Sequence, residues 1–134
     1  MKGMFVNSDG CIPYAECIVW GIKSVETRNR NMLRPLIGER VAVVRTHRGK
    51  NPMIVGYVTV THGYRVGGQW LHDNRDKTLI PEGSKYDVPI DGAKWCYWLR
   101  NAVKCDPYPL PADAIRHGIS WVEFETPQKG DADD

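Results

Sequence analysis

The sequence predicts a single-domain α+β protein built on a small mixed β-barrel of five or six strands, with one main helix and a long flap. Three observations support this fold class. Short runs rich in β-branched residues recur along the chain, only one segment has clear helical spacing, and strict alternation of strands and helices is absent. A chain of 134 residues fits one domain, which we place at residues 1–126, before an acidic tail at 127–134 that we expect to be disordered.

The first elements are a short strand and the main helix. Met4–Val6 is apolar and is followed by a dense turn signal at residues 7–10. Residues 13–20 then have helical spacing, and Pro13 suits a first helical position. Gly21 predicts the end of this helix.

A second strand is expected at residues 24–28, where β-branched and polar residues alternate. Alternation places Ser24, Glu26 and Arg28 on one face of the strand, while Lys23 lies at the bend before it. The sequence therefore predicts that an amine, a carboxylate and a guanidinium share one small space. Residues 29–38 have weak periodicity and are expected to cross the surface as a loop or a single turn.

A hairpin follows. Residues 40–45 are apolar on both faces, which is typical of a strand covered on both sides, and residues 53–61 are rich in β-branched residues. Gly56 inside the second of these strands indicates a bulge or a tight corner.

Residues 63–92 are interrupted by glycines and prolines, and we interpret them as a flap with a short helix near residues 70–75. The flap carries aromatic residues suited to stacking on a base; pinning the loop to the barrel is an equally good role for them. Residues 94–103 predict the next strand, and Pro107, Pro109 and Pro111 are expected to prevent regular structure after it. Residues 120–124 predict the closing strand.

Composition excludes several classes of protein. The apolar runs are too short for a transmembrane helix and the N-terminus lacks a signal-peptide core, so we expect a cytoplasmic protein with no membrane partner. The four cysteines lack zinc-finger spacing and are expected to be reduced, and we expect neither a metal nor another cofactor. Net charge is +2, but residues 1–67 hold ten Lys or Arg against four acidic residues. Such a basic half attracts phosphate, although solvated turns account for the Arg45–Lys50 cluster about as well.

The spacing Gly-x-Lys-x-x-Glu-x-Arg, formed by Gly21, Lys23, Glu26 and Arg28, resembles the signature of the ASCH domain family, within the PUA-like group of RNA-related β-barrels. The preceding Pro13-Tyr14-Ala15 resembles the start of the helix that this family places before its signature.

The resemblance implies binding of RNA or a modified nucleoside, with hydrolysis as the next hypothesis. Some ASCH-like proteins are amidohydrolases that deacylate acetylated cytidine, and others are RNA-binding or RNA-cleaving. Lys23 falls on the lysine position of the deacylating branch, but Glu26 stands where that branch has threonine, which leaves Ser24 and Thr27 as nearby hydroxyl residues. A non-catalytic adaptor that presents its basic face to a protein, and a salt-bridged cluster that only orders the strand, are the alternatives.

The candidate residues fall into two groups. Lys23, Glu26 and Ser24 are the candidate catalytic residues. The candidate ligand-binding residues are Tyr14, Arg28, Arg30, Trp70, Tyr86 and Trp98.

Overall fold

The structure is a computed structural model that describes residues 1–126 of the chain. Seven strands form one mixed sheet in the order β2-β5-β4-β3-β1-β7-β6. Only the β1–β3 pair is parallel, and the first and last strands of the sheet do not pair with each other. The strands are β1 (Lys2–Asn7), β2 (Val25–Arg28), β3 (Arg40–Thr46), β4 (Met53–Gly67), β5 (Ala93–Pro109), β6 (Ile115–His117) and β7 (Trp121–Glu123). The helices are α1 (Tyr14–Val19), the 3-10 turn η1 (Arg34–Leu36), α2 (Gly68–Asp73) and α3 (Arg75–Thr78).

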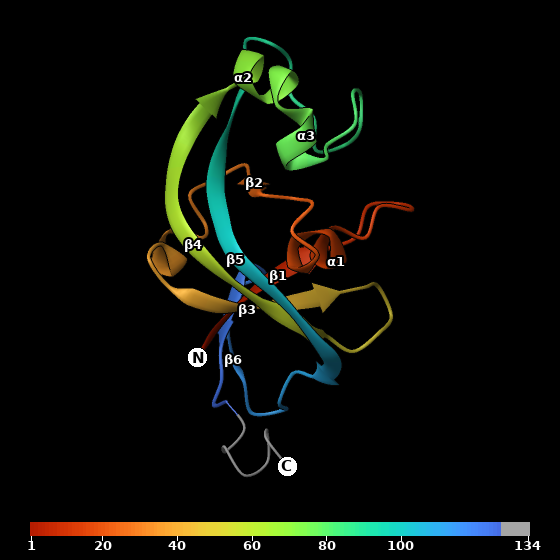
Figure 1. Cartoon of the computed structure of the whole chain (residues 1–134), viewed down its shortest axis with the longest axis vertical. Coiled ribbons are helices and arrows are strands. Elements are labelled where there is room, and N and C mark those ends of the chain that lie inside the picture. The colour runs from red at the N-terminus through yellow and green to blue at the C-terminus, as the bar shows by residue number, and fades with distance from the viewer. Residues whose placement is uncertain (127–134) are drawn as a thin grey trace.

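The predicted fold class is confirmed: the molecule is an α+β protein with a strongly curved mixed sheet, although that sheet is open rather than a closed barrel. Figure 1 shows β4 and β5 as a long bent hairpin that carries α2 and α3 at one end and crosses β3 and β1 at the other. Strands β6 and β7 extend the sheet beyond β1. The count of seven exceeds the expected five or six because β6, an exposed strand of three residues, has too little pattern to be recognised in sequence.

A bulge in β4 adjoins Gly56, as predicted. The register between β3 and β4 shifts at Val43/Val44, opposite this glycine. A Cβ atom at Gly56 would lie 2.3 Å from the carbonyl oxygen of Val103 and 2.6 Å from Cγ1 of Val19. Glycine is therefore required because the neighbouring strand and α1 approach the backbone closely.

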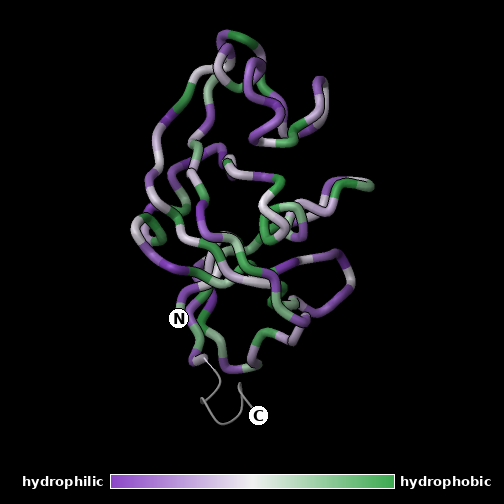
Figure 2. The backbone as a smooth tube through the Cα atoms, in the orientation of Figure 1, coloured by the Kyte–Doolittle hydropathy of each residue, from purple (hydrophilic) through white to green (hydrophobic). Residues whose placement is uncertain are grey.

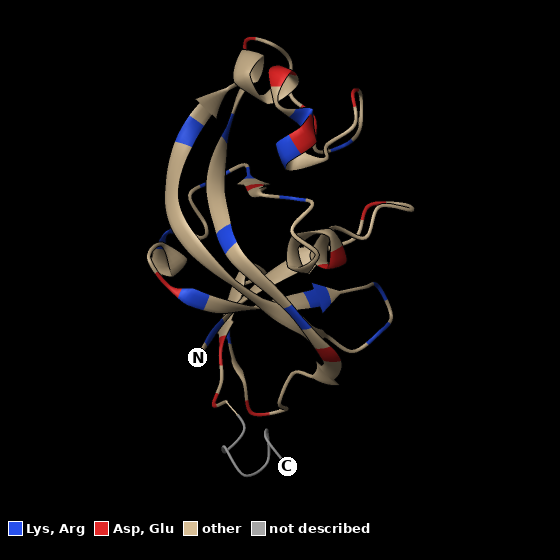
Figure 3. Cartoon of the chain, viewed as in Figure 1, with Lys and Arg blue, Asp and Glu red and all other residues tan. Residues whose placement is uncertain are grey.

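The core lies between the curved sheet and α1. Figure 2 shows hydrophobic residues concentrated where the strands cross and along α1. Leu33 and Leu36 are fully buried there, so the segment expected to cross the surface instead anchors η1 in the core. Figure 3 shows the basic residues around the β3–β4 turn that the sequence predicted.

Two predictions about element boundaries are wrong. Residues 63–67 continue β4, and the flap contains α2 and α3 rather than one short helix. Pro107 and Pro109 lie inside β5, although they were expected to exclude regular structure. Prolines are tolerated here because this end of β5 pairs only with β4, so its other edge needs no N–H donor.

None of the helices within residues 1–126 has the length and apolar character needed to cross a bilayer. All four cysteines are unpaired. The expected tail at residues 127–134 lies outside the described residues.

Candidate functional site

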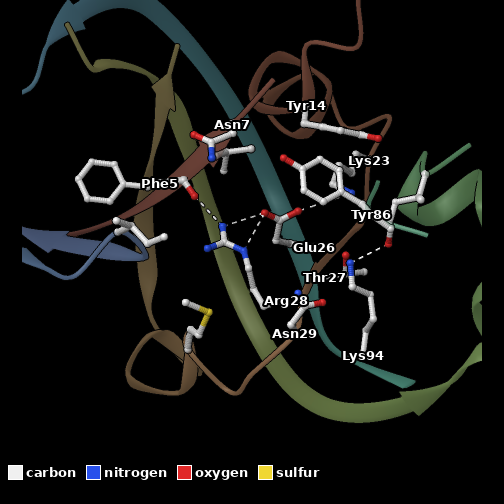
Figure 4. A pocket seen from close by; sticks show the side chains of 14 residues that line it. Phe5, Asn7, Tyr14, Lys23, Glu26, Thr27, Arg28, Asn29, Tyr86 and Lys94 are labelled. Carbon is white, nitrogen blue, oxygen red and sulfur yellow. Dashed lines mark hydrogen bonds and ion pairs between the residues drawn. The ribbon is translucent and has the colours of Figure 1, made fainter. Parts of the chain in front are cut away.

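A cavity of about 260 Å³ opens beside the free edge of β2. Its wall comes from five parts of the chain: the end of β1, the start of α1, the segment through β2, the flap with the first residues of β5, and Ile119 between β6 and β7. Figure 4 shows the side chains that line it. The polar and aromatic residues in this wall are Phe5, Asn7, Tyr14, Lys23, Glu26, Thr27, Arg28, Asn29, Tyr86 and Lys94.

The end of α1 positions Lys23. Gly21 has a φ of +79°, a conformation that favours glycine, and it turns the chain so that the backbone N–H groups of Ile22 and Lys23 both donate to the carbonyl of Cys17. The Lys23 side chain, only 2% exposed, then points into the site and donates to the backbone oxygen of Thr78 in the flap. Its ammonium lies 4.8 Å from the centre of the Tyr14 ring.

The alternation of β2 places Glu26 and Arg28 together, as the sequence predicted. Nη2 of Arg28 lies 2.8 Å from Oε2 of Glu26, and Nζ of Lys23 lies 3.5 Å from Oε1. Arg28 also donates to the backbone oxygen of Phe5 in β1, at 2.6 Å. The carboxylate therefore sits between two cations, and one of them is fixed to a second strand.

Burial and charge act in opposite directions on this cluster. Burial alone would raise the pKa of Glu26, but the adjacent charges of Arg28 and Lys23 outweigh it and hold that pKa below its usual value. Burial lowers the pKa of Lys23, and the Glu26 charge opposes part of that change. The site thus keeps an ionised carboxylate beside an amine that gives up its proton more readily than an exposed lysine does.

Two backbone carbonyls of the flap accept hydrogen bonds from the side chains of Lys23 and Tyr14. Besides Thr78, the carbonyl of Leu79 accepts from the hydroxyl of Tyr14 at 3.2 Å, and Leu79 has a φ of +60°. The pKa of Tyr14 is raised to about 12 by burial and by nearby carboxylates, first Asp9 and then Glu26. Tyr14 therefore stays protonated and remains a donor.

Asp87 holds the flap itself together. Its carboxylate accepts from the backbone N–H of Gly83 at 2.8 Å and from both terminal nitrogens of Arg75 at 3.2 Å. These contacts, the Gly83 hydrogen bond foremost, lower the pKa of Asp87 to about 2. The Asp87 carboxylate therefore stabilises the flap, and its hydrogen bonds within the flap leave it no role in holding a ligand.

Five of the nine predicted site residues line the cavity: Tyr14, Lys23, Glu26, Arg28 and Tyr86. The other four do not. Arg30 is exposed beyond the end of β2, and the backbone of Ser24 is bonded to Lys77 and Leu99. Trp70 and Trp98 pack together, with ring centres 5.5 Å apart, in a cluster on the other face of β2 and β5.

Sequence reasoning missed Lys94, Asn7 and Asn29. Lys94 is the clearest case, because a lysine opening the apolar run Trp95–Leu99 is an available signal for a buried amine. Its side chain is buried and donates to the carbonyl of Tyr86 at 2.7 Å. Asn7 and Asn29 carry no such signal, since asparagine in a turn is common.

A basic hollow adjoins the cavity. The two share Asn7 and Tyr86 in their walls. The basic residues around this hollow are His47, Arg48, Lys50, Lys85 and Arg116. The tertiary structure thus brings two cations from later in the chain to the basic turn that the sequence predicted.

The comparisons with known proteins identify similar structures but no similar sequences. No family model matches the sequence, and no curated protein matches it significantly. The solved structure of ASCH from Zymomonas mobilis superposes with a TM-score of 0.62 over 98% of this chain and 91% of that one, at 16% identity. A serine-to-alanine variant of the same protein gives 0.60 over 80% and 73%, and a tyrosine-to-phenylalanine variant gives 0.58 over 82% and 77%, each at 18% identity.

The curved mixed sheet, the single helix before β2 and these superpositions define the class of protein. The chain has an ASCH-like fold. The predicted resemblance is confirmed at the level of fold.

Proposed function

We propose that the cavity binds one nucleoside unit, either a modified nucleoside or a base within single-stranded RNA. The observation that carries this proposal is that the buried Lys23–Glu26–Arg28 cluster lines an open cavity instead of lying in the packed core. Buried ion clusters are a poor means of stabilising a fold, and they are typical of sites where charge serves binding or catalysis.

The chemistry of the wall suits a nucleobase. The rings of Tyr14 and Tyr86 lie 6.0 Å apart, edge to face, and offer apolar surface beside the charged cluster. Arg28 and Lys23 are donors and Glu26 is an acceptor, which is the combination that reads the edge of a base. A volume of about 260 Å³ is slightly below the roughly 300–1,000 Å³ of drug-sized pockets, so a single nucleoside fits better than a helix.

The basic hollow supports the RNA form of the ligand. It adjoins the cavity at Asn7 and Tyr86, so a base held in the cavity would leave its backbone phosphates near Arg48 and Lys50. Such contacts provide affinity without base specificity, and they make binding depend on salt.

Hydrolysis of an acylated nucleoside is the second candidate, and the lowered pKa of Lys23 favours it. The neutral amine of Lys23 would take a proton from the attacking water, while the Arg28 guanidinium would stabilise the oxyanion that forms on the acyl carbonyl. The resulting ammonium would return that proton to the leaving nitrogen as the acyl C–N bond breaks, which releases the acid and the free nucleoside. A base of this kind predicts a rate that rises with pH until Lys23 is deprotonated, then levels off.

Calorimetric titration with nucleosides, acylated cytidines and short single-stranded RNAs tests both functions. Arg28→Met should weaken binding of the preferred ligand about tenfold or more, because a hydrogen bond to a charged group is lost. Arg40→Met is the matched control, since Arg40 bonds Thr59 and Asn101 at the surface and lies outside the cavity wall.

The same titrations separate a binding protein from an enzyme. If acylated cytidine is a substrate, Lys23→Met should abolish release of the acid while measurable binding remains. Failure of every nucleoside and RNA to bind better than a charge-matched polyanion would refute the proposal and favour the adaptor hypothesis.

A further inference from the structure

Lys94 is a buried lysine whose charge lacks an acidic partner. It opens β5, is 4% exposed, and its Nζ donates to the backbone oxygen of Tyr86 at 2.7 Å. Within residues 1–126 no carboxylate lies at ion-pair distance from it. Lys23 is more deeply buried, at 2% exposed, but it has Glu26 at 3.5 Å.

The cavity wall therefore carries more positive than negative charge. Three cations, Lys23, Arg28 and Lys94, face one carboxylate, and Glu26 already lies between the first two. Isolating an ammonium from water costs several kcal/mol unless a partner offsets it. Burial accordingly lowers the pKa of Lys94, and the Glu26 charge opposes only part of this effect.

The geometry leaves this amine available to a ligand. An ammonium has three donors, and the Tyr86 carbonyl uses one of them. Figure 4 shows the side chain on the Thr27 and Asn29 side of the cavity, apart from the ion cluster. Lys94 is thus a hydrogen-bond donor in the cavity wall, and none of the ion pairs within residues 1–126 includes it.

We infer that Lys94 receives an anionic oxygen of the ligand, so that the cavity selects a nucleoside bearing a carboxylate or a phosphate over its neutral counterpart. This inference rests on the proposed function and names the ligand class within it. A carboxylate and a phosphate both offer a negatively charged oxygen, which would balance the excess positive charge of the cavity wall. They differ in where they are attached, the carboxylate to the base and the phosphate to the sugar.

The test measures affinity for matched pairs of ligands by calorimetric titration. One pair is 5-carboxycytidine and 5-carbamoylcytidine, which differ in the charge on the base. The other pair is cytidine 5′-monophosphate and cytidine. The wild-type protein should bind the anionic member of one pair about tenfold or more tightly, as expected for a charge-assisted hydrogen bond, and that pair identifies the source.

Lys94→Met should reduce the preference to less than about threefold, because the neutral ligand offers this amine no charge to lose. Lys77→Met is the matched control: Lys77 contacts Asn74 and Asp76 within the flap and lies outside both the cavity and the basic hollow, so the preference should remain. If Lys94→Met does not fold, the NMR signals of Cε-labelled lysines in the wild-type protein replace it. One buried lysine signal should then shift with the anionic ligand and stay unchanged with the neutral one.

Three outcomes would overturn the inference. Equal binding of both members of each pair by the wild-type protein would refute it and leave the proposed function intact. A preference that survives Lys94→Met, or a buried lysine signal that does not respond to the anionic ligand, would assign the selectivity to another cation. Absence of binding by all four ligands and by RNA would instead refute the proposed function, and the inference with it.

Discussion

Replacing Glu26 with glutamine should lower the free energy of unfolding, because it removes the negative charge that offsets the buried charge of Lys23. The change is nearly isosteric, so it removes the charge and leaves the packing of β2 in place. Lys23, at 3.5 Å from the carboxylate and 2% exposed, would lose its negatively charged partner and keep the Thr78 carbonyl and the Tyr14 ring. Arg28 is less affected, because it is more exposed and retains its bond to Phe5.

The magnitude follows from these distances. At 3.5 Å and an effective dielectric constant of about 20, the lost Lys23–Glu26 attraction is about 5 kcal/mol. Lys23 can avoid part of this cost by losing its proton, which at pH 7 takes at most about 4.6 kcal/mol from a pKa of about 10.4. We therefore expect Glu26→Gln to lower the free energy of unfolding by about 3–5 kcal/mol, the usual range for breaking a buried pair.

Urea unfolding at pH 7, followed by circular dichroism, measures this change. Glu39→Gln is the control, because Glu39 pairs with Lys2 at the surface and should lose less than about 1 kcal/mol. The double variant Lys23→Met/Glu26→Gln removes both charges and should cost clearly less than the sum of the single changes. A loss below about 1 kcal/mol for Glu26→Gln, or strict additivity in the double variant, would refute the reasoning.

Two further predictions concern stability. Acidification should destabilise the wild type more than Glu26→Gln: the pKa of Glu26 is lowered by folding, so its contribution is complete above the unfolded value of about 4.3 and is lost as the pH falls through the folded value. Urea midpoints between pH 5 and 2 test this, and parallel curves for the two proteins would contradict it. Gly56→Ala should lower stability by about 2 kcal/mol or more, because the new Cβ would meet the Val103 carbonyl at 2.3 Å. Thermal melts compare it with Gly67→Ala, whose Cβ would meet no atom within 4 Å, and equal losses would show that the close approach is not what requires glycine.

Local sequence signals were sufficient for the first half of the site. Gly21 ends α1 because its positive φ favours glycine, and the two-residue period of β2 alone brings Glu26 and Arg28 to one face. The bulge at Gly56 was also predictable, since glycine weakens the interior of an apolar strand unless the backbone bends or is closely approached there.

The flap was only partly predictable. Tyr86 and Trp70 look alike in sequence, both aromatic residues in an irregular segment, yet Tyr86 lines the cavity and Trp70 packs against Trp98. Their positions depend on how α2 and α3 fold back on β2, where the backbone N–H of Ser24 bonds the carbonyl of Lys77. No local pattern encodes that contact, because it joins segments more than 50 residues apart.

The sequence by itself determined the class of fold, the turn out of α1 and the pairing of acid and guanidinium on β2, because these depend on backbone preferences and on the period of a strand. Only the tertiary structure decided what the charged cluster faces. The Thr78 carbonyl contacts Lys23 of the cluster, while the Tyr86 ring and Lys94 complete the wall of the cavity beside it. These positions depend on a hairpin with a bulge at Gly56 and on a flap that returns to the sheet. The physical reason is that a cavity is made by long-range packing, and the position of its walls is a property of the whole sheet rather than of any one segment.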